Sequence, residues 1–324
     1  MTTAIASRLR IRNARVVLLA GALLLVLTTL FDPQLTYQQP RYRFLAVFDI
    51  TQSMNVTDAG TSYDARLSRL TRAKHTLGEI LPHLPCATEM GVGIFTQHRT
   101  LPLIAPVEVC ANRNELAELI AKLSWEMAWD ARSEVAKGLF SALSVAKTLG
   151  EHTHIIFFTD GHEAPPINPQ FAPRFAGTPG SVTGTMVGVG GEIPRSIPKF
   201  DGAGKQRGFW RADEVLQVDT YSLGRFQGGE PMVGVEVGDI AQRIAAGTEH
   251  LSSLREAYLQ DTARRVGIEY HRLSGARALL EVLLQERNGV SEAAVLDLRA
   301  ALIAVALLLV LAANLISLAS NKNQ

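Results

Sequence analysis

The sequence predicts an α/β fold, in which helices cover both faces of a doubly wound, mainly parallel sheet. Apolar stretches of strand length alternate with stretches of helical apolar spacing through the middle of the 324-residue chain. Two of the apolar stretches, 44–48 and 153–159, run directly into Asp49 and Asp160. Central parallel strands are buried on both faces, and their carboxyl ends open where such sheets bind ligands. We therefore expect a ligand site just after these two strands.

The first part of this region reads as strand, helix and hairpin. The strand 44–48 is followed by apolar or small residues at helical spacing over 66–84, and Pro85 ends that helix. Segments 90–96 and 100–104 are strand-like and lie close together in sequence, which predicts an antiparallel hairpin. The hairpin supplies the one antiparallel strand of the expected sheet.

The second part continues the alternation of strands and helices. Further helices are expected at 114–123, 135–149, 258–266 and 276–286, and further strands at 153–159, 181–189 and 268–273. No second domain is suggested by this order. The connection 191–250 is longer than a strand-to-helix crossing needs, and its Asp201-Gly202-Ala203-Gly204 turn predicts an inserted hairpin. Its aromatic and basic residues are either a partner surface or a loop packed on its own domain.

Two nearly charge-free apolar segments, 16–31 and 300–319, stand at the two ends of the chain. The second is long enough to cross a membrane, and its alternative is a buried core helix. The first is a retained anchor or a signal peptide, and the lack of a clear cleavage site favours the anchor. Arginines precede the first segment, which predicts a cytoplasmic amino terminus and an extracytoplasmic main domain. They are Arg8, Arg10, Arg12 and Arg15.

The composition leaves room for a sizeable core and argues against a nucleic-acid partner. Hydrophobic residues make up 47% of the chain, and the formal net charge is only +1. A protein that binds a polyanion through its phosphates needs a basic surface, which this charge balance does not suggest.

Oxygen-bearing side chains follow the two apolar strands at short intervals. Asp49, Thr51 and Ser53 alternate after the first strand, Ser133 precedes the helix predicted at 135–149, and Asp160 ends the second strand. Two carboxylates and three hydroxyls suit a hard divalent ion that takes about six oxygen ligands. Mg²⁺ is the first expectation, with Ca²⁺ and Mn²⁺ as alternatives.

The same five residues resemble the three metal loops of von Willebrand factor A (VWA) domains, over most of 42–286. The family's first loop is usually Asp-x-Ser-x-Ser, so Thr51 departs from it but keeps the hydroxyl, and Ser133 stands where the family usually has threonine. The resemblance implies a metal-ion-dependent adhesion site. Its hydroxyls would bind the ion directly, its aspartates largely through water, and a partner protein's carboxylate would complete the coordination. The alternative is a nucleotide-type fold in which Asp49 and Asp160 only cap turns or helices.

With this resemblance, the chain divides into anchors, linkers and one VWA domain. The predicted parts are a cytoplasmic tail 1–15, a transmembrane helix 16–31, a linker 32–41, the VWA domain 42–286 with its insertion at about 191–250, a linker 287–299, a transmembrane helix 300–319 and a cytoplasmic tail 320–324. The location this implies is the bacterial inner membrane, with the main domain in the periplasm.

The residues near the third loop favour binding over turnover. His162 and Glu163 follow Asp160 directly and are candidates for contact with the partner. No activated nucleophile or dedicated general base accompanies them, so we expect no enzymatic activity. A metal-dependent hydrolase that uses Asp160 and Glu163 is the alternative from a different functional class.

The two cysteines, Cys86 and Cys110, flank the predicted hairpin. If Phe95 pairs with Thr100, the cysteines come almost opposite each other at the open end. In an oxidising periplasm this predicts a disulfide, and the alternative is two buried free thiols.

A narrower resemblance is to the membrane-bound VWA proteins associated with bacterial methanol oxidation. It is carried by 49–55, the hairpin 86–110, and segments 125–129, 160–166 and 197–201. It implies an accessory role in maturation of, or metal insertion into, a periplasmic quinoprotein dehydrogenase, with a MoxR-type AAA+ ATPase and other VWA accessory proteins as partners. The alternative is a general VWA adaptor in an envelope-stress or aerotolerance system.

Overall fold

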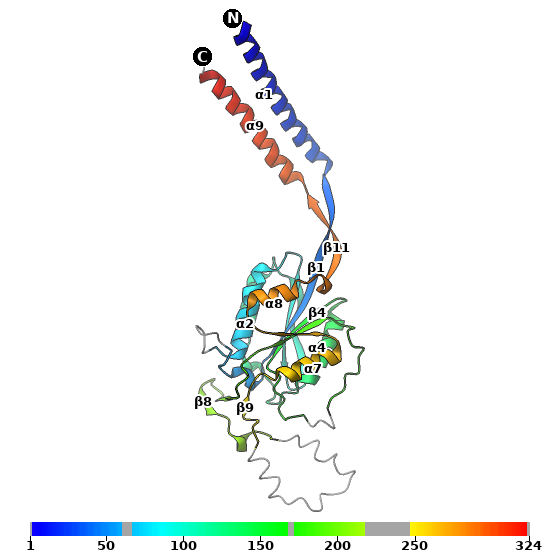
Figure 1. Cartoon of the computed structure of the whole chain (residues 1–324), viewed down its shortest axis with the longest axis vertical. Helices are drawn as coiled ribbons and strands as arrows, with labels where there is room; N and C mark the ends of the chain where they lie inside the picture. The colour runs from blue at the N-terminus through cyan, green and yellow to red at the C-terminus, as the bar shows by residue number, and fades with distance from the viewer. Residues whose placement is uncertain (1, 60–66, 168–171, 218–246, 323–324) are drawn as a thin grey trace, which may run out of the picture. The chain divides into compact units, whose positions relative to one another are not determined.

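The computed structural model describes residues 2–59, 67–167, 172–217 and 247–322. The chain forms two compact units, one of residues 41–290 and one that joins residues 1–40 to 291–324. The larger unit holds the sheet and the helices around it, and the smaller unit holds the two terminal helices (Figure 1).

The main sheet is mostly parallel, with strand order β10-β5-β4-β1-β2-β3 and β11 paired to β1. Its strands are β1 (Gln34–Asp49), β2 (Glu89–Thr96), β3 (Arg99–Glu108), β4 (His154–Thr159), β5 (Gly184–Gly188), β10 (Glu269–Arg272) and β11 (Gly289–Asp297). Along the six-strand path every pairing is parallel except that of β2 with β3. The predicted fold class is confirmed.

Helices pack on both faces of this sheet, because the side chains of β1 alternate between two cores. Phe44 and Phe48 belong to the core shared with α2 (Arg69–Ile80), α3 (Arg113–Lys122) and α8 (Ala276–Leu283). Leu45 and Val47 belong to the core shared with α4 (Val135–Leu149) and α7 (Glu256–Val266). The segment 44–48 of β1 is therefore buried on both faces, which explains why its side chains are all apolar.

The predicted helices are present with small changes at their ends. The helix expected at 66–84 begins at Arg69, where the Ser68 side chain caps it by accepting a hydrogen bond from Thr71 N. It ends at Ile80 and continues as a 3₁₀ turn over Leu81–His83. The start of the predicted segment, residue 66, lies outside the described residues.

The segments predicted as linkers are strands in the structure. Strand β1 begins at Gln34, and β11 pairs with it over a region where most side chains of both strands are exposed. Leu298 N donates to Pro33 O over 3.1 Å, and Ser291 Oγ bonds to Gln38 Oε1 over 3.1 Å. Because neither face of this ribbon is buried, its sequence lacks the apolar alternation by which a strand is usually found.

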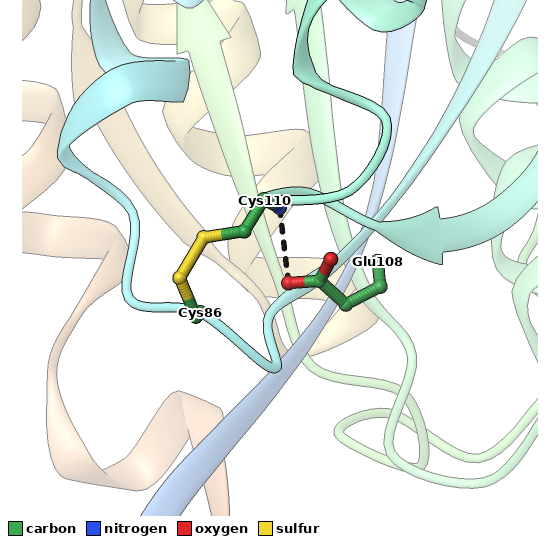
Figure 2. Close-up of side chains that lie close together, drawn as sticks. All are labelled: Cys86, Glu108 and Cys110. Atoms are coloured by element: carbon green, nitrogen blue, oxygen red, sulfur yellow. Dashed lines mark hydrogen bonds between the residues drawn. A yellow bond between two sulfur atoms is a disulfide. The ribbon is translucent and has the colours of Figure 1, made fainter. Parts of the chain in front are cut away.

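The hairpin has the predicted register near its turn, two irregularities shift the register farther along, and the predicted disulfide closes the open end. Phe95 pairs with Thr100, and Cys86 is bonded to Cys110 with a Cα–Cα distance of 5.4 Å. Glu108 lies beside the disulfide (Figure 2). Its carboxylate accepts hydrogen bonds from the backbone nitrogens of Ala111 (2.6 Å), Cys110 (2.9 Å) and Ala87 (3.1 Å), which lower its pKa. Disulfide and carboxylate together fix this turn.

The smaller unit contains two long apolar helices that contact each other, α1 (Thr2–Thr28) and α9 (Arg299–Lys322). Segments Asn13–Phe31 and Arg299–Ile316 have mean hydropathies of 2.3 and 2.4 and meet the length and composition expected of a membrane span. Only 6% and 11% of these segments are buried, unlike the core helix of a soluble protein. Two apolar terminal helices are therefore present where the sequence predicts them.

The insertion contains the expected hairpin. Strands β7 (Pro198–Phe200) and β8 (Gln206–Phe209) pair antiparallel around the Asp201-Gly202-Ala203-Gly204 turn. A second short ladder joins β6 (Arg195–Ser196) to β9 (Leu251–Ser252). Residues 218–246 of the insertion lie outside the described residues.

Candidate metal centre

Three loops meet at the carboxyl edge of the sheet. Strands β1 and β4 are parallel neighbours and end at Asp49 and next to Asp160. The Ser133 loop joins them through a pair of backbone hydrogen bonds with Ala164, of 2.7 and 2.8 Å. Thr51, Ser53 and Ser133 line one cavity of about 190 Å³. The fold thus brings together the oxygen-bearing residues of all three predicted loops.

Asp49 is fully buried and held from both of its oxygens. Its Oδ1 accepts hydrogen bonds from Thr51 N (2.9 Å) and Thr51 Oγ1 (2.7 Å), and its Oδ2 accepts one from Thr159 Oγ1 (2.7 Å). Burial, together with the nearby charge of Asp160, raises the pKa of Asp49 to about 7. Two buried carboxylates that disfavour each other's ionisation form a site that a cation stabilises.

Asp160 is also fully buried, but a cation from the chain lies against it. Burial alone would raise its pKa, and the Arg69 guanidinium lowers the pKa below its usual value. Arg69 Nη1 and Ser252 Oγ both donate to Asp160 Oδ2, the latter over 3.0 Å, while His162 N donates to Oδ1 over 2.9 Å. Arg69 itself is 0% exposed and makes a two-point contact with Asp58, of 2.8 and 2.6 Å.

Arg69 and Asp58 belong to the site but were not predicted from the sequence. The helix pattern could have pointed to Arg69, because Arg69 occupies the buried face of α2 together with Ala73 and Leu77. A charged residue on an otherwise apolar helix face needs a buried partner of opposite charge.

The hydroxyl groups fit a hard cation. Ser133 is 2% exposed, and its Oγ has no hydrogen-bond partner within the part of the chain that the structure describes. The Thr51 hydroxyl donates its proton to Asp49, and Ser53 bonds to Asp160, so their oxygens keep lone pairs for a metal. Thr51 Oγ1 and Ser53 Oγ lie 3.4 Å apart. These hydroxyls with Asp49 and Asp160 would hold Mg²⁺, which would supply positive charge and a position for an acidic ligand.

Glu163 contacts other parts of the chain through both carboxylate oxygens. Val135 N donates to Oε2 and Ala136 N to Oε1, each over 2.9 Å, and the Tyr258 hydroxyl also donates to Oε1. Burial raises its pKa to about 7. Glu163 therefore connects the third loop to the start of α4 and to α7, while its role in partner contact stays a prediction.

His162 lies closer to the space above the metal loops. It is 2% exposed, it lines the same cavity as Ser133, and its Nε2 lies 3.8 Å from Glu249 Oε2. Burial lowers its pKa to about 4, so the imidazole is neutral at neutral pH. Its role in partner contact stays a prediction.

Comparison with known proteins gives structural similarities only. No family model matches the chain, and no curated protein matches it. The chain is similar to an aerotolerance-related membrane protein from Bacteroides fragilis, with 16% identity over 76% of this chain and 98% of that one, and a TM-score of 0.48. It is also similar to BatB, a conserved hypothetical protein from Bacteroides thetaiotaomicron, with 17% identity over 76% of this chain and 97% of that one, and a TM-score of 0.47. A third similar structure is the ArnB paralog VWA2 from Sulfolobus acidocaldarius, with 11% identity over 48% of this chain and 36% of that one, and a TM-score of 0.29.

Proposed function

We propose that this chain is a membrane-anchored adaptor that binds an acidic group of a partner protein through a divalent cation. The residues that would hold the cation are Asp49, Thr51, Ser53, Ser133 and Asp160. The observation that carries the proposal is the buried Ser133 hydroxyl, which lacks a partner among the described residues and lines a cavity shared with Thr51 and Ser53. A buried polar atom is rarely left without a partner unless a ligand, an ion or an ordered water supplies one.

The contacts of the nearby acidic groups support binding over hydrolysis. Asp160 accepts from Arg69 and Ser252, and Glu163 accepts from the amino terminus of α4 and from Tyr258. A general base needs a carboxylate that is within reach of a substrate proton. Both carboxylates are already used in holding the loops together, which favours an adaptor over the alternative hydrolase.

Anchoring would hold this centre just outside the cytoplasmic membrane. The two apolar helices α1 and α9 lie at the chain ends, and the four arginines early in the sequence favour a cytoplasmic amino terminus. The Cys86–Cys110 disulfide is consistent with an oxidising compartment such as the periplasm. Cysteines introduced into exposed loops of the main domain test this orientation. Labelling of these cysteines in intact cells would support it, and labelling only after lysis would contradict it.

The client of the adaptor is a separate proposal. A general role in envelope-stress or aerotolerance complexes needs only the centre and the anchors. A role in maturation of a quinoprotein methanol dehydrogenase, alongside a MoxR-type ATPase, stays a prediction from the sequence resemblance. Capture of partners with the wild-type chain and with Asp49→Ala tests both, because a true client is recovered with the first and lost with the second.

Calorimetric titration of the full-length protein with Mg²⁺ tests the metal centre directly. We expect one ion per chain and a loss of at least about tenfold in affinity for Ser133→Ala, because one hydroxyl ligand is removed. Ser144→Ala is the matched control, since Ser144 lies on the exposed side of α4 and its hydroxyl donates to Phe140 O in its own helix. If the wild-type chain binds no Mg²⁺, Mn²⁺ or Ca²⁺, the proposal is wrong.

A further inference from the structure

The cavity above the metal loops has a second wall, built by the insertion. Besides Thr51, Ser53 and Ser133, apolar side chains of the insertion line it, together with Trp210. The apolar residues are Ile197, Val215 and Leu216. We call Ile197, Trp210, Val215 and Leu216 the apolar wall. A ligand that reaches the metal loops through this cavity must therefore lie against the apolar wall.

The cavity has room for one medium-sized side chain beside a carboxylate. Its volume is about 190 Å³, somewhat larger than the roughly 150 Å³ of an engineered apolar cavity that binds benzene. The wall is firmly built, because Ile197 N donates to His250 O over 3.1 Å and Trp210 N donates to Ile197 O over 3.0 Å. Ile197 is 5% exposed, while Leu216 is 52% exposed at the mouth.

Trp210 offers an unused hydrogen-bond donor at this wall. Its Nε1 is buried and has no acceptor among the described residues. An indole N–H can only donate, so an acceptor oxygen, such as one carried by a ligand, would satisfy it. Lys199 Nζ lies 4.5 Å from the centre of the Trp210 ring and pairs with Glu214 Oε1 at 2.5 Å. These contacts hold the ring in place and set a positive charge beside the Glu214 carboxylate, which lines the cavity.

Three buried polar atoms that have no hydrogen-bond partner among the described residues thus belong to side chains that line one cavity. They are Ser133 Oγ, His162 Nδ1 and Trp210 Nε1. The metal would use the first, which leaves a donor at Trp210 and the His162 imidazole for the rest of the ligand. The remaining carboxylate of the cavity, Glu249, faces His162.

We propose that the apolar wall is a second subsite, which selects carboxylate ligands that carry an apolar side chain next to the acid. One carboxylate oxygen would bind the metal, the apolar side chain would lie against Ile197, Val215 and Leu216, and the Trp210 N–H would donate to an oxygen of the same ligand. This inference rests on the proposed function, since it assumes a metal-bound carboxylate. Both an acidic side chain followed by leucine and a carboxyl-terminal leucine have this chemistry.

Binding of short synthetic peptides to the full-length protein in detergent with saturating Mg²⁺ tests the inference. Four peptides whose other residues are uncharged serve as probes. Three have blocked ends and carry Asp-Leu, Asp-Ser or Asn-Leu at the centre. The fourth has a carboxyl-terminal leucine, whose carboxylate is its only acid. We expect Asp-Leu to bind about tenfold more tightly than Asp-Ser, because the leucine side chain leaves water. Asn-Leu should not bind measurably. Tighter binding of Asp-Leu would identify an acidic side chain as the source of the carboxylate. Tighter binding of the terminal-leucine peptide would identify a chain carboxyl terminus.

Variants of the wall separate selection from metal binding. Leu216→Ser should abolish the preference for Asp-Leu, while Ile193→Ser is the matched control, since Ile193 is 68% exposed and does not line the cavity. Trp210→Phe keeps a ring but removes the donor, and it should weaken both Asp peptides about fivefold while leaving Mg²⁺ affinity unchanged.

The two proposals fail in different ways. If Asp-Leu and Asp-Ser bind equally in a Mg²⁺-dependent manner, or if Leu216→Ser retains the preference, the apolar wall does not select and only this inference is wrong. If the protein binds neither Mg²⁺ nor any acidic peptide, the proposed function is wrong and this inference falls with it.

Discussion

The guanidinium of Arg69 donates a hydrogen bond to Asp160 Oδ2, and both side chains are completely buried. The same guanidinium holds Asp58 by two hydrogen bonds and reaches Ser252, whose Oγ lies 2.7 Å from Nη1. Arg69 thus joins the third metal loop to the start of α2 and to β9. The positive charge of Arg69 therefore lies on one side of Asp160. The attraction within this buried ion pair offsets part of the free-energy cost of burying the carboxylates of the site.

Replacement of Arg69 should be strongly destabilising. Arg69→Met keeps an apolar stem of similar length but leaves Asp58 and Asp160 buried without their counter-charge, which costs about 3–5 kcal/mol in the free energy of unfolding. Added Mg²⁺ should recover part of this loss, because it supplies positive charge to Asp160. Thermal unfolding with and without Mg²⁺ measures both effects. Arg277→Met is the control, since the Arg277 side chain is 93% exposed, and an equal loss in both variants would contradict the role of Arg69.

The sequence was enough to find two carboxylates of the candidate metal centre but not the charged groups packed behind them. Asp49 and Asp160 could be found because each ends a strand that is apolar on both faces, and such strands have one functional end. Arg69 could not be connected to them, because the partners through which it reaches the candidate centre lie far away in sequence. It contacts Asp160 and Ser252 across separations of 91 and 183 residues. Only the packing of α2 against the sheet brings these groups together.

Exposed elements were also beyond the sequence pattern. Helix α4 was predicted with its observed bounds, since one face is buried along its length. The sequence predicts linkers where the paired strands over 34–41 and 289–297 lie, because these strands are exposed on both faces and rely on backbone hydrogen bonds to each other. Alternation of apolar and polar residues marks a strand with one buried face. It is absent where neither face is buried.

Glu163 should position the Ser133 loop. In Glu163→Gln the amide group can accept through one oxygen only, and its NH₂ would face the backbone donor of Val135 or Ala136. We expect a loss of about 1–3 kcal/mol in the free energy of unfolding. Mg²⁺ affinity should fall as well, because Ala164, next to Glu163, holds Ser133 through two backbone hydrogen bonds. Calorimetry and thermal unfolding measure the two effects.

Tyr258→Phe is the matched comparison for Glu163→Gln. It removes one hydrogen bond to Glu163 and leaves the two bonds from α4 in place. A smaller loss of stability, about 1 kcal/mol, with little change in Mg²⁺ affinity is expected. Unchanged Mg²⁺ affinity in Glu163→Gln would show that the carboxylate only stabilises the fold.

The disulfide should stabilise the domain without affecting the metal centre. Cys86 and Cys110 are 24 residues apart, and their removal in Cys86→Ser with Cys110→Ser should cost about 2–4 kcal/mol. Cys86 precedes Glu89 and Cys110 follows Glu108, the residue that pairs with Glu89. This is the end of β2 opposite to Phe95, which pairs with Asp49. Mg²⁺ affinity should therefore be unchanged. Addition of a reductant should lower the unfolding temperature of the wild-type protein and leave that of the double variant as it was, and a drop in both would argue against the disulfide as the cause.

A buried histidine should make the stability of the domain depend on pH. His154 is 1% exposed on β4, its ring nitrogens bond to Thr183 and Thr185 at 3.1 and 3.0 Å, and burial, followed by the charge of Arg287, lowers its pKa from 6.5 to about 3. Above pH 6.5 both folded and unfolded chains carry a neutral imidazole, so this residue adds no pH dependence. Below it the unfolded chain takes up a proton that the folded chain does not, and stability falls by about 1.4 kcal/mol per pH unit until about pH 3.

Comparison with His154→Gln isolates this contribution. Asp49 and Glu163, whose raised pKa values act in the opposite direction, are present in both proteins, so their effects cancel in the difference. Glutamine keeps a donor and an acceptor near Thr183 and Thr185 but cannot take up a proton. The wild-type protein should be the more stable of the two at pH 7.5, and this advantage should shrink by about 2 kcal/mol at pH 5. Parallel stability curves between pH 7.5 and 5 would mean that His154 is protonated equally in the folded and unfolded chains.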